Sequence, residues 1–90
     1  MKYFYQKEND HYSEHIIVSD DGIFDGYYVK MNDGMWERRY NKSDPTLKIG
    51  TYQGSGRRYP IPPTAKEITK KEVDSMVFLD LLSSNRTKNI

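Results

Sequence analysis

The 90-residue chain contains no cysteine. This absence excludes disulfide bonds, thiolate catalysis and zinc sites built on cysteine. Long apolar runs are also missing. The longest, Met76–Leu79, has four residues, whereas a signal peptide needs about 7–15 and a membrane-spanning helix about 18. We therefore expect a soluble, cytoplasmic protein that does not associate with a membrane.

A strong net charge is missing as well, because 14 basic and 13 acidic residues leave +1. No overall field attracts nucleic acid or an anionic surface. The chain is instead rich in aromatic residues, which make up 13% of it and include eight tyrosines. Tyrosine buries apolar area while keeping a polar tip, so a small globular core is feasible. We expect one domain over residues 1–84 and a frayed tail over residues 85–90.

Turn-forming residues divide the first two thirds of the chain into short segments typical of antiparallel strands. Three of the four prolines lie within Tyr59–Pro63. We interpret that segment as an extended connection, since proline cannot donate to a central ladder. The sequence predicts an α+β fold, in which an antiparallel sheet of four or five strands is packed by one C-terminal helix. The expected strands are Lys2–Gln6, Glu14–Ser19, Gly26–Met31, Met35–Tyr40 and Leu47–Gln53.

The strongest local turn signal is Asp33-Gly34, which favours a two-residue type I′ hairpin. In that register Lys30 lies across from Glu37 and Tyr28 lies across from Arg39. The opposite face of the hairpin becomes a candidate core side. Its apolar and aromatic residues are Tyr27, Val29, Met31, Trp36 and Tyr40.

A helix start is encoded at Thr69, where Glu72 follows at the spacing of a capping box. Ile68 and Val73 have the spacing of a hydrophobic staple around this cap. The pattern predicts a helix from about Lys70 to Ser83 or Ser84.

Apolar side chains on this helix point around more than half of its circumference, which is more than a small sheet on one side covers. Two alternatives follow. Either the helix pairs with its copy in a homodimer, or the N-terminal tyrosines and the proline-rich segment wrap over it. The residues expected to carry the self-association are Met76, Leu79 and Leu82.

Candidate metal and catalytic groups are sparse. His11 and His15 have a spacing that zinc ligands use, but the segment lacks a third strong ligand. Asp20, Asp21 and Asp25 do not match the spacing of a calcium loop, and turn chemistry explains them. A nucleotide-binding loop leads directly into a helix, whereas the glycines around Ser55 lead into prolines. We expect no metal, no cofactor and no enzymatic activity.

Two basic–aromatic triplets are the most function-like feature of the sequence. Such residues supply stacking planes and phosphate contacts, and they are also the residues of protein-binding hot spots. Because the net charge is close to zero, a larger protein partner is favoured and weak nucleic-acid binding is the alternative. The predicted partner-binding residues are Arg38, Arg39, Tyr40, Arg57, Arg58 and Tyr59.

In size and composition the chain resembles the small accessory proteins that bacteriophages encode, which include anti-CRISPR proteins and other inhibitors of host machinery. Like them it is short, free of cysteine and rich in Tyr, Asn, Asp and Lys. The resemblance carries no motif and no site residue. It implies an inhibitor or adaptor that docks on a larger protein.

Overall fold

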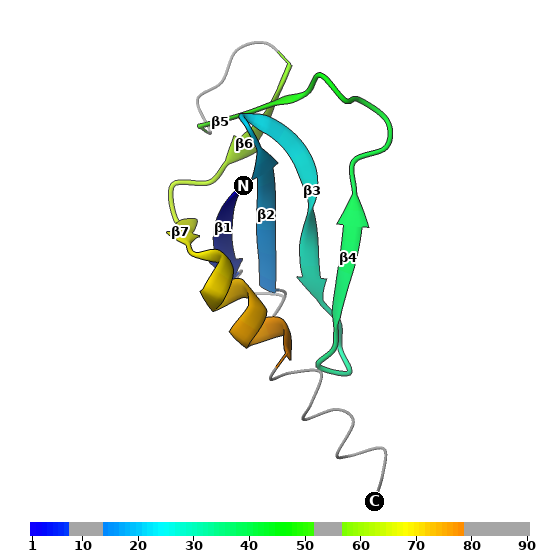
Figure 1. The fold of residues 1–90 in the computed structure, drawn as a ribbon, viewed down its shortest axis with the longest axis vertical. Helices are drawn as coiled ribbons and strands as arrows, with labels where there is room; N and C mark the ends of the chain where they lie inside the picture. The colour runs from blue at the N-terminus through cyan, green and yellow to red at the C-terminus, as the bar shows by residue number, and fades with distance from the viewer. Residues whose placement is uncertain (8–13, 52–56, 79–90) are drawn as a thin grey trace, which may run out of the picture.

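The computed structural model describes residues 1–7, 14–51 and 57–78. They form one sheet and one helix, which covers residues 70–78 (Figure 1). The predicted α+β fold with a single C-terminal helix is therefore confirmed. The strands are β1 (Lys2–Lys7), β2 (Glu14–Asp20), β3 (Ile23–Lys30), β4 (Trp36–Tyr40), β5 (Lys48–Thr51), β6 (Arg58–Ile61) and β7 (Lys66–Ile68). The predicted helix end and the tail over residues 85–90 lie outside the described residues.

The sheet is mixed rather than purely antiparallel, and within the described residues it has seven strands rather than four or five. Its order is β6-β5-β3-β2-β1-β7, and β4 pairs with β3 beside β5. The interpretation of the proline-rich segment was wrong, because part of it forms β6, which pairs parallel to β5 with Pro60 opposite Gly50. As the outermost strand on this path, β6 tolerates a residue without an N–H on its open side.

Two of the three Asp-Gly pairs of the chain, Asp21-Gly22 and Asp33-Gly34, build turns of different types. Asp21 and Gly22 both have positive φ, 50° and 82°, which is the two-residue type I′ turn between β2 and β3. At the second pair only Gly34 has a positive φ, 86°. Met31 N donates to Met35 O at 2.7 Å, which closes a three-residue loop. The predicted register of the β3–β4 hairpin was therefore wrong by one residue.

This shift changes which side chains share a face. Lys30 pairs with Trp36 and Tyr28 pairs with Arg38, so Trp36 lies on the same side as Tyr28. Tyr27 and Val29 point to the opposite side of the sheet, because successive residues of a strand alternate. The predicted core side of the hairpin is thus divided between the two faces.

The helix packs on one face of the sheet, and its start follows the predicted capping box. Glu72 N donates to Thr69 Oγ1 at 3.1 Å, and Thr69 N donates to Glu72 Oε1 at 3.2 Å. Val73 and Ile68, the predicted staple, are both buried in the core. The other members of the same core cluster are Tyr3, Ile16 and Val18, with Tyr5, Tyr28, Trp36, Met76 and Val77 packed around them.

The helix leaves part of the sheet uncovered. In Figure 1 the helix crosses the lower ends of β1 and β2, whereas β4 lies beyond β3, laterally away from the helix. No helix among the described residues has the length and apolarity that crossing a bilayer requires.

Candidate functional site

A bulge in β3 sets the geometry of the β3–β4 part of the sheet. Val18 pairs with Gly26 and Ser19 pairs with Phe24, so Asp25 is the extra residue of the bulged strand. Gly26 has φ 133°, and a Cβ atom there would lie 2.1 Å from the carbonyl oxygen of Arg39. The same Cβ would lie 2.8 Å from Nη1 of Arg38. Glycine at position 26 therefore leaves the space into which the Arg38 side chain extends.

The Arg38 guanidinium contacts four groups of its own chain. Its guanidinium forms an ion pair with Asp25, and Nη1 donates to the carbonyl oxygen of Arg39 at 2.6 Å. It lies 4.0 Å from the ring centroid of Tyr40 and 5.1 Å from that of Tyr28, both cation–π distances. Only 18% of the Arg38 side chain is exposed, whereas Tyr40 is 59% exposed. The outer element of this arrangement is thus the Tyr40 ring, which rests on a fixed cation.

We call these four residues, Asp25, Tyr28, Arg38 and Tyr40, the arginine–tyrosine cluster. They come from two paired strands, and Tyr28, Arg38 and Tyr40 share the face of the sheet that carries the helix, where Tyr28 packs against the core. Asp25 and Tyr28 were missing from the predicted site. The alternation of side chains in β4 could have placed Arg38 with Tyr40, but the bulge that brings Asp25 to Arg38 has no clear sequence signal besides Gly26.

Arg39 lies apart from Arg38, on the opposite face of the sheet. Its Nε donates to Glu37 Oε1 at 3.2 Å. Hydrogen bonding to the Tyr27 hydroxyl and then to the Glu37 carboxylate raises the pKa of Arg39 above its usual range. The first predicted triplet is therefore shared between two faces.

The second triplet is spread over the end of the sheet. Arg57 pairs with Asp44 at 2.9 Å, and the side chain of Arg58 lies against Gly50. The ring of Tyr59 stacks on Phe24 at 3.9 Å between centroids with 3° between the planes. Burial raises the pKa of Tyr59. Tyr59 thus covers the buried ring of Phe24, and the structure does not join the six predicted residues into one surface.

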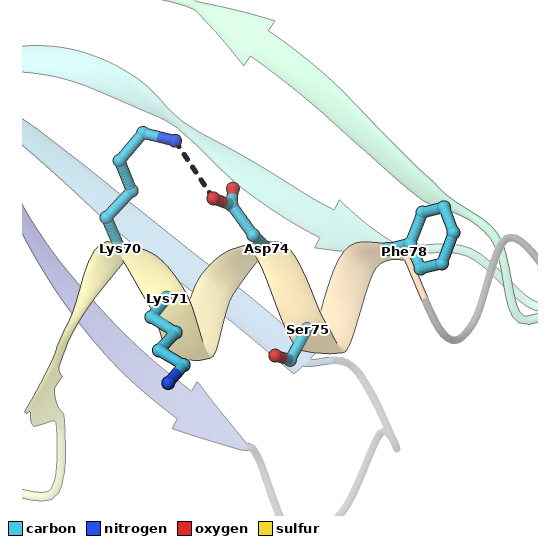
Figure 2. Close-up of a pocket in the computed structure, with 5 residues that line it drawn as sticks. All are labelled: Lys70, Lys71, Asp74, Ser75 and Phe78. Atoms are coloured by element: carbon cyan, nitrogen blue, oxygen red, sulfur yellow. Dashed lines mark hydrogen bonds and ion pairs between the residues drawn. The ribbon is translucent and has the colours of Figure 1, made fainter.

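The predicted self-association residues are only partly described. Met76 is half-buried against the core of its own chain, while Leu79 and Leu82 lie outside the described residues. Phe78 is 61% exposed. It lines an open hollow on the outer side of the helix with Lys70, Lys71, Asp74 and Ser75. Figure 2 shows Lys71 and Ser75 pointing away from the side that carries the Lys70–Asp74 ion pair, so these groups do not converge on one point.

The predicted metal and phosphate candidates are also placed where they are described. His15 is half-buried and meets Tyr27 edge to face at 5.9 Å. Asp25 is engaged by Arg38. His11 and the glycines around Ser55 lie outside the described residues. Across residues 1–7, 14–51 and 57–78, no three His, Asp or Glu side chains are grouped to hold a metal ion.

Comparisons of this chain with protein-family models, with curated proteins and with solved structures found no match.

Proposed function

We propose that the chain is a non-enzymatic binding protein that docks on a larger protein through the arginine–tyrosine cluster. The observation that carries this proposal is the Tyr40 ring, which is 59% exposed and rests on an arginine with 18% of its side chain exposed. Tyrosine and arginine are enriched in protein hot spots, where a rigid aromatic group gains area at low entropic cost. A ring that is already held in place loses little freedom when it binds.

The ion pairs favour a protein partner over nucleic acid. Arg38, Arg39 and Arg57 each contact a carboxylate of the same chain. Nucleic-acid affinity comes mainly from cations that neutralise phosphates and release counterions. Part of the charge of these three arginines is therefore already balanced within the chain, which reduces what a phosphate contact adds. Weak nucleic-acid binding is accordingly the second candidate.

A capture experiment tests the proposal with matched variants. The tagged chain is incubated with a lysate of cells that carry its gene, beside Tyr40→Ala and Phe78→Ala, which each remove one exposed ring. We expect one protein to be captured by the parent chain and by Phe78→Ala but not by Tyr40→Ala. Purified again, that protein should bind the chain directly in calorimetry.

Two results would contradict the proposal. Equal capture by all three chains would place the binding surface elsewhere, and capture that nuclease abolishes would favour the nucleic-acid alternative. Circular dichroism of Tyr40→Ala identical to that of the parent chain ensures that lost capture reflects a lost contact.

A further inference from the structure

The outer edge of β4 carries no further strand among the described residues. Among the described residues β4 pairs with β3 alone, while β5 takes the other part of the same β3 edge. Hydrogen bonds mark both ends of the β3–β4 pairing, from Met31 N to Met35 O at 2.7 Å and from Asn41 N to Asp25 O at 2.9 Å. Because hydrogen-bonded pairs alternate along an antiparallel ladder, the backbone groups of residues 37 and 39 point toward β3. Those of residues 36, 38 and 40 point outward.

This alternation of inward and outward backbone groups restricts the register in which a second strand can pair with the outer edge of β4. A copy related by a two-fold axis perpendicular to the sheet runs antiparallel, and only its own even-numbered residues can meet these outward groups. Three registers keep most of β4 paired. One places Glu37 across from Glu37 of the copy, and another places Arg39 across from Arg39. The third, centred on Arg38, places each Glu37 across from the Arg39 of the other copy.

We propose that β4 pairs with β4 of a second copy of this chain in the register centred on Arg38. It is the one register of the three in which the facing charges at positions 37 and 39 are opposite rather than equal. Opposite charges facing each other across strands stabilise a sheet, and like charges destabilise it. The strand Trp36–Tyr40 is thus complementary to itself.

The side chains of β4 suit this pairing on both faces. On one face, Glu37 and Arg39 already form an ion pair at 3.2 Å and are about half-exposed, at 50% and 46%, so a second pair of opposite charges completes a four-charge cluster. On the other face, the register places the exposed Tyr40 across from Trp36 of the copy. The two Arg38 residues meet at the axis, where each guanidinium is neutralised by the Asp25 of its own chain.

The dimer should be weak, since five paired residues bury less than the roughly 1,200 Å² of a standard stable interface. We expect a chain that is mostly monomeric at about 10 µM and substantially dimeric toward about 1 mM. Pairing at β4 would bring two arginine–tyrosine clusters side by side on one face of a continuous sheet. The pairing does not depend on the proposed partner protein.

Charge reversal tests the register by sedimentation equilibrium of the full chain. Glu37→Arg and Arg39→Glu each place like charges across the axis, so each should lower the association constant at least tenfold. An equimolar mixture of the two variants again faces arginine with glutamate at both positions and should associate as the parent chain does. Lys71→Glu, which reverses an exposed charge on the helix, should leave association unchanged.

The mixture guards against a variant that merely unfolds, because a misfolded chain would not regain association on mixing. A parent chain that stays monomeric at 1 mM would overturn the proposal. A dimer whose association constant is unchanged by both charge reversals would overturn it as well. So would a dimer that Leu79→Glu abolishes while Glu37→Arg has no effect, because the interface would then involve Leu79 rather than β4.

Discussion

At the scale of single residues, Gly26 is the position on which the arginine–tyrosine cluster depends. Its φ of 133° is a conformation that residues with a side chain rarely adopt, and its missing Cβ leaves space for backbone and guanidinium. Gly22 also has a positive φ, 82°, but a Cβ there would meet nothing within 4 Å. A substitution at Gly22 therefore introduces conformational strain alone, whereas one at Gly26 introduces both strain and steric overlap.

We predict that Gly26→Ala lowers the free energy of unfolding by about 3 kcal/mol or more, because strain and backbone overlap add. Gly22→Ala should cost only about 1–2 kcal/mol, the cost of a left-handed alanine. Urea denaturation followed by circular dichroism measures both. Equal losses at the two positions would show that the close approach at Gly26 is relaxed at little cost.

Tyr5 is a second informative residue, because its hydroxyl donates to Glu14 at 2.7 Å while Glu14 also pairs with Lys30 at 3.3 Å. Burial first, and then the hydrogen bond and charge of Glu14, raise the pKa of Tyr5 to about 12. A folded-state pKa above the unfolded value of 10.0 means that this contribution to stability is complete below pH 10. It is then lost as the pH rises toward 12.

We predict that Tyr5 deprotonates near pH 12 in the folded chain, as followed by the ring carbon shifts of ¹³C-labelled tyrosine. Tyr5→Phe should remove that signal and identify it. Glu14→Gln should bring the pKa down only in part, since burial is the larger cause. Titration of the Tyr5 signal near pH 10 in the parent chain would refute the buried arrangement.

At the scale of elements, local signals in the sequence predicted the helix cap and the positions of most strands. They did not predict which strands pair with one another or in which register. The capping box at Thr69 was predictable because all its partners lie within four residues. β6 and β7 were not, because β6 lies in the proline-rich segment and β7 is a three-residue strand that pairs with β1 at the other end of the sequence. The Asp33-Gly34 turn was placed correctly, but a two-residue and a three-residue loop share the same sequence signal.

The register of the β3–β4 hairpin has a direct spectroscopic consequence. Tyr28 and Arg38 are a non-hydrogen-bonded pair, in which the two Hα atoms approach closely. We predict a strong Hα–Hα nuclear Overhauser effect between these two residues, and another between Lys30 and Trp36. Contacts from Arg38 to Val29 instead would restore the two-residue loop and its different division of faces.

The helix cap gives a prediction of its own. Thr69→Ala removes the side-chain acceptor for Glu72 N and should lower the free energy of unfolding by about 1 kcal/mol. Thr64→Ala, in the exposed turn before β7, is the matched control and should change it by less than about 0.5 kcal/mol. Thermal denaturation of both variants compares them. A cap variant as stable as the control would mean that tertiary packing alone holds the helix start.

At the scale of the whole molecule, folding brings together charges that the sequence keeps apart. Residues 1–33 carry seven acidic residues against three lysines, and residues 34–71 carry nine basic residues against three acidic ones. The β3–β4 hairpin joins these segments and pairs Asp25 with Arg38. The sequence pointed to Arg38 and Tyr40 as binding residues. The sequence could not show that Asp25 neutralises the charge of Arg38, because this ion pair depends on the bulge in β3 and on the alternation of side chains in β4.

This neutralisation separates the two candidate functions experimentally. If the arginines keep their carboxylate partners, a single-stranded oligonucleotide should show no retarded band in a gel-shift series, even at about 50 mM salt. Asp44→Ala frees Arg57, whose side chain is 84% exposed, and should create weak binding that is lost by about 200 mM salt. Strong retardation by the parent chain, reduced in Arg57→Ala, would instead show that phosphate outcompetes Asp44. The basic residues near β6 would then be a nucleic-acid site. The ion pairs of the arginines would no longer favour a protein partner over nucleic acid.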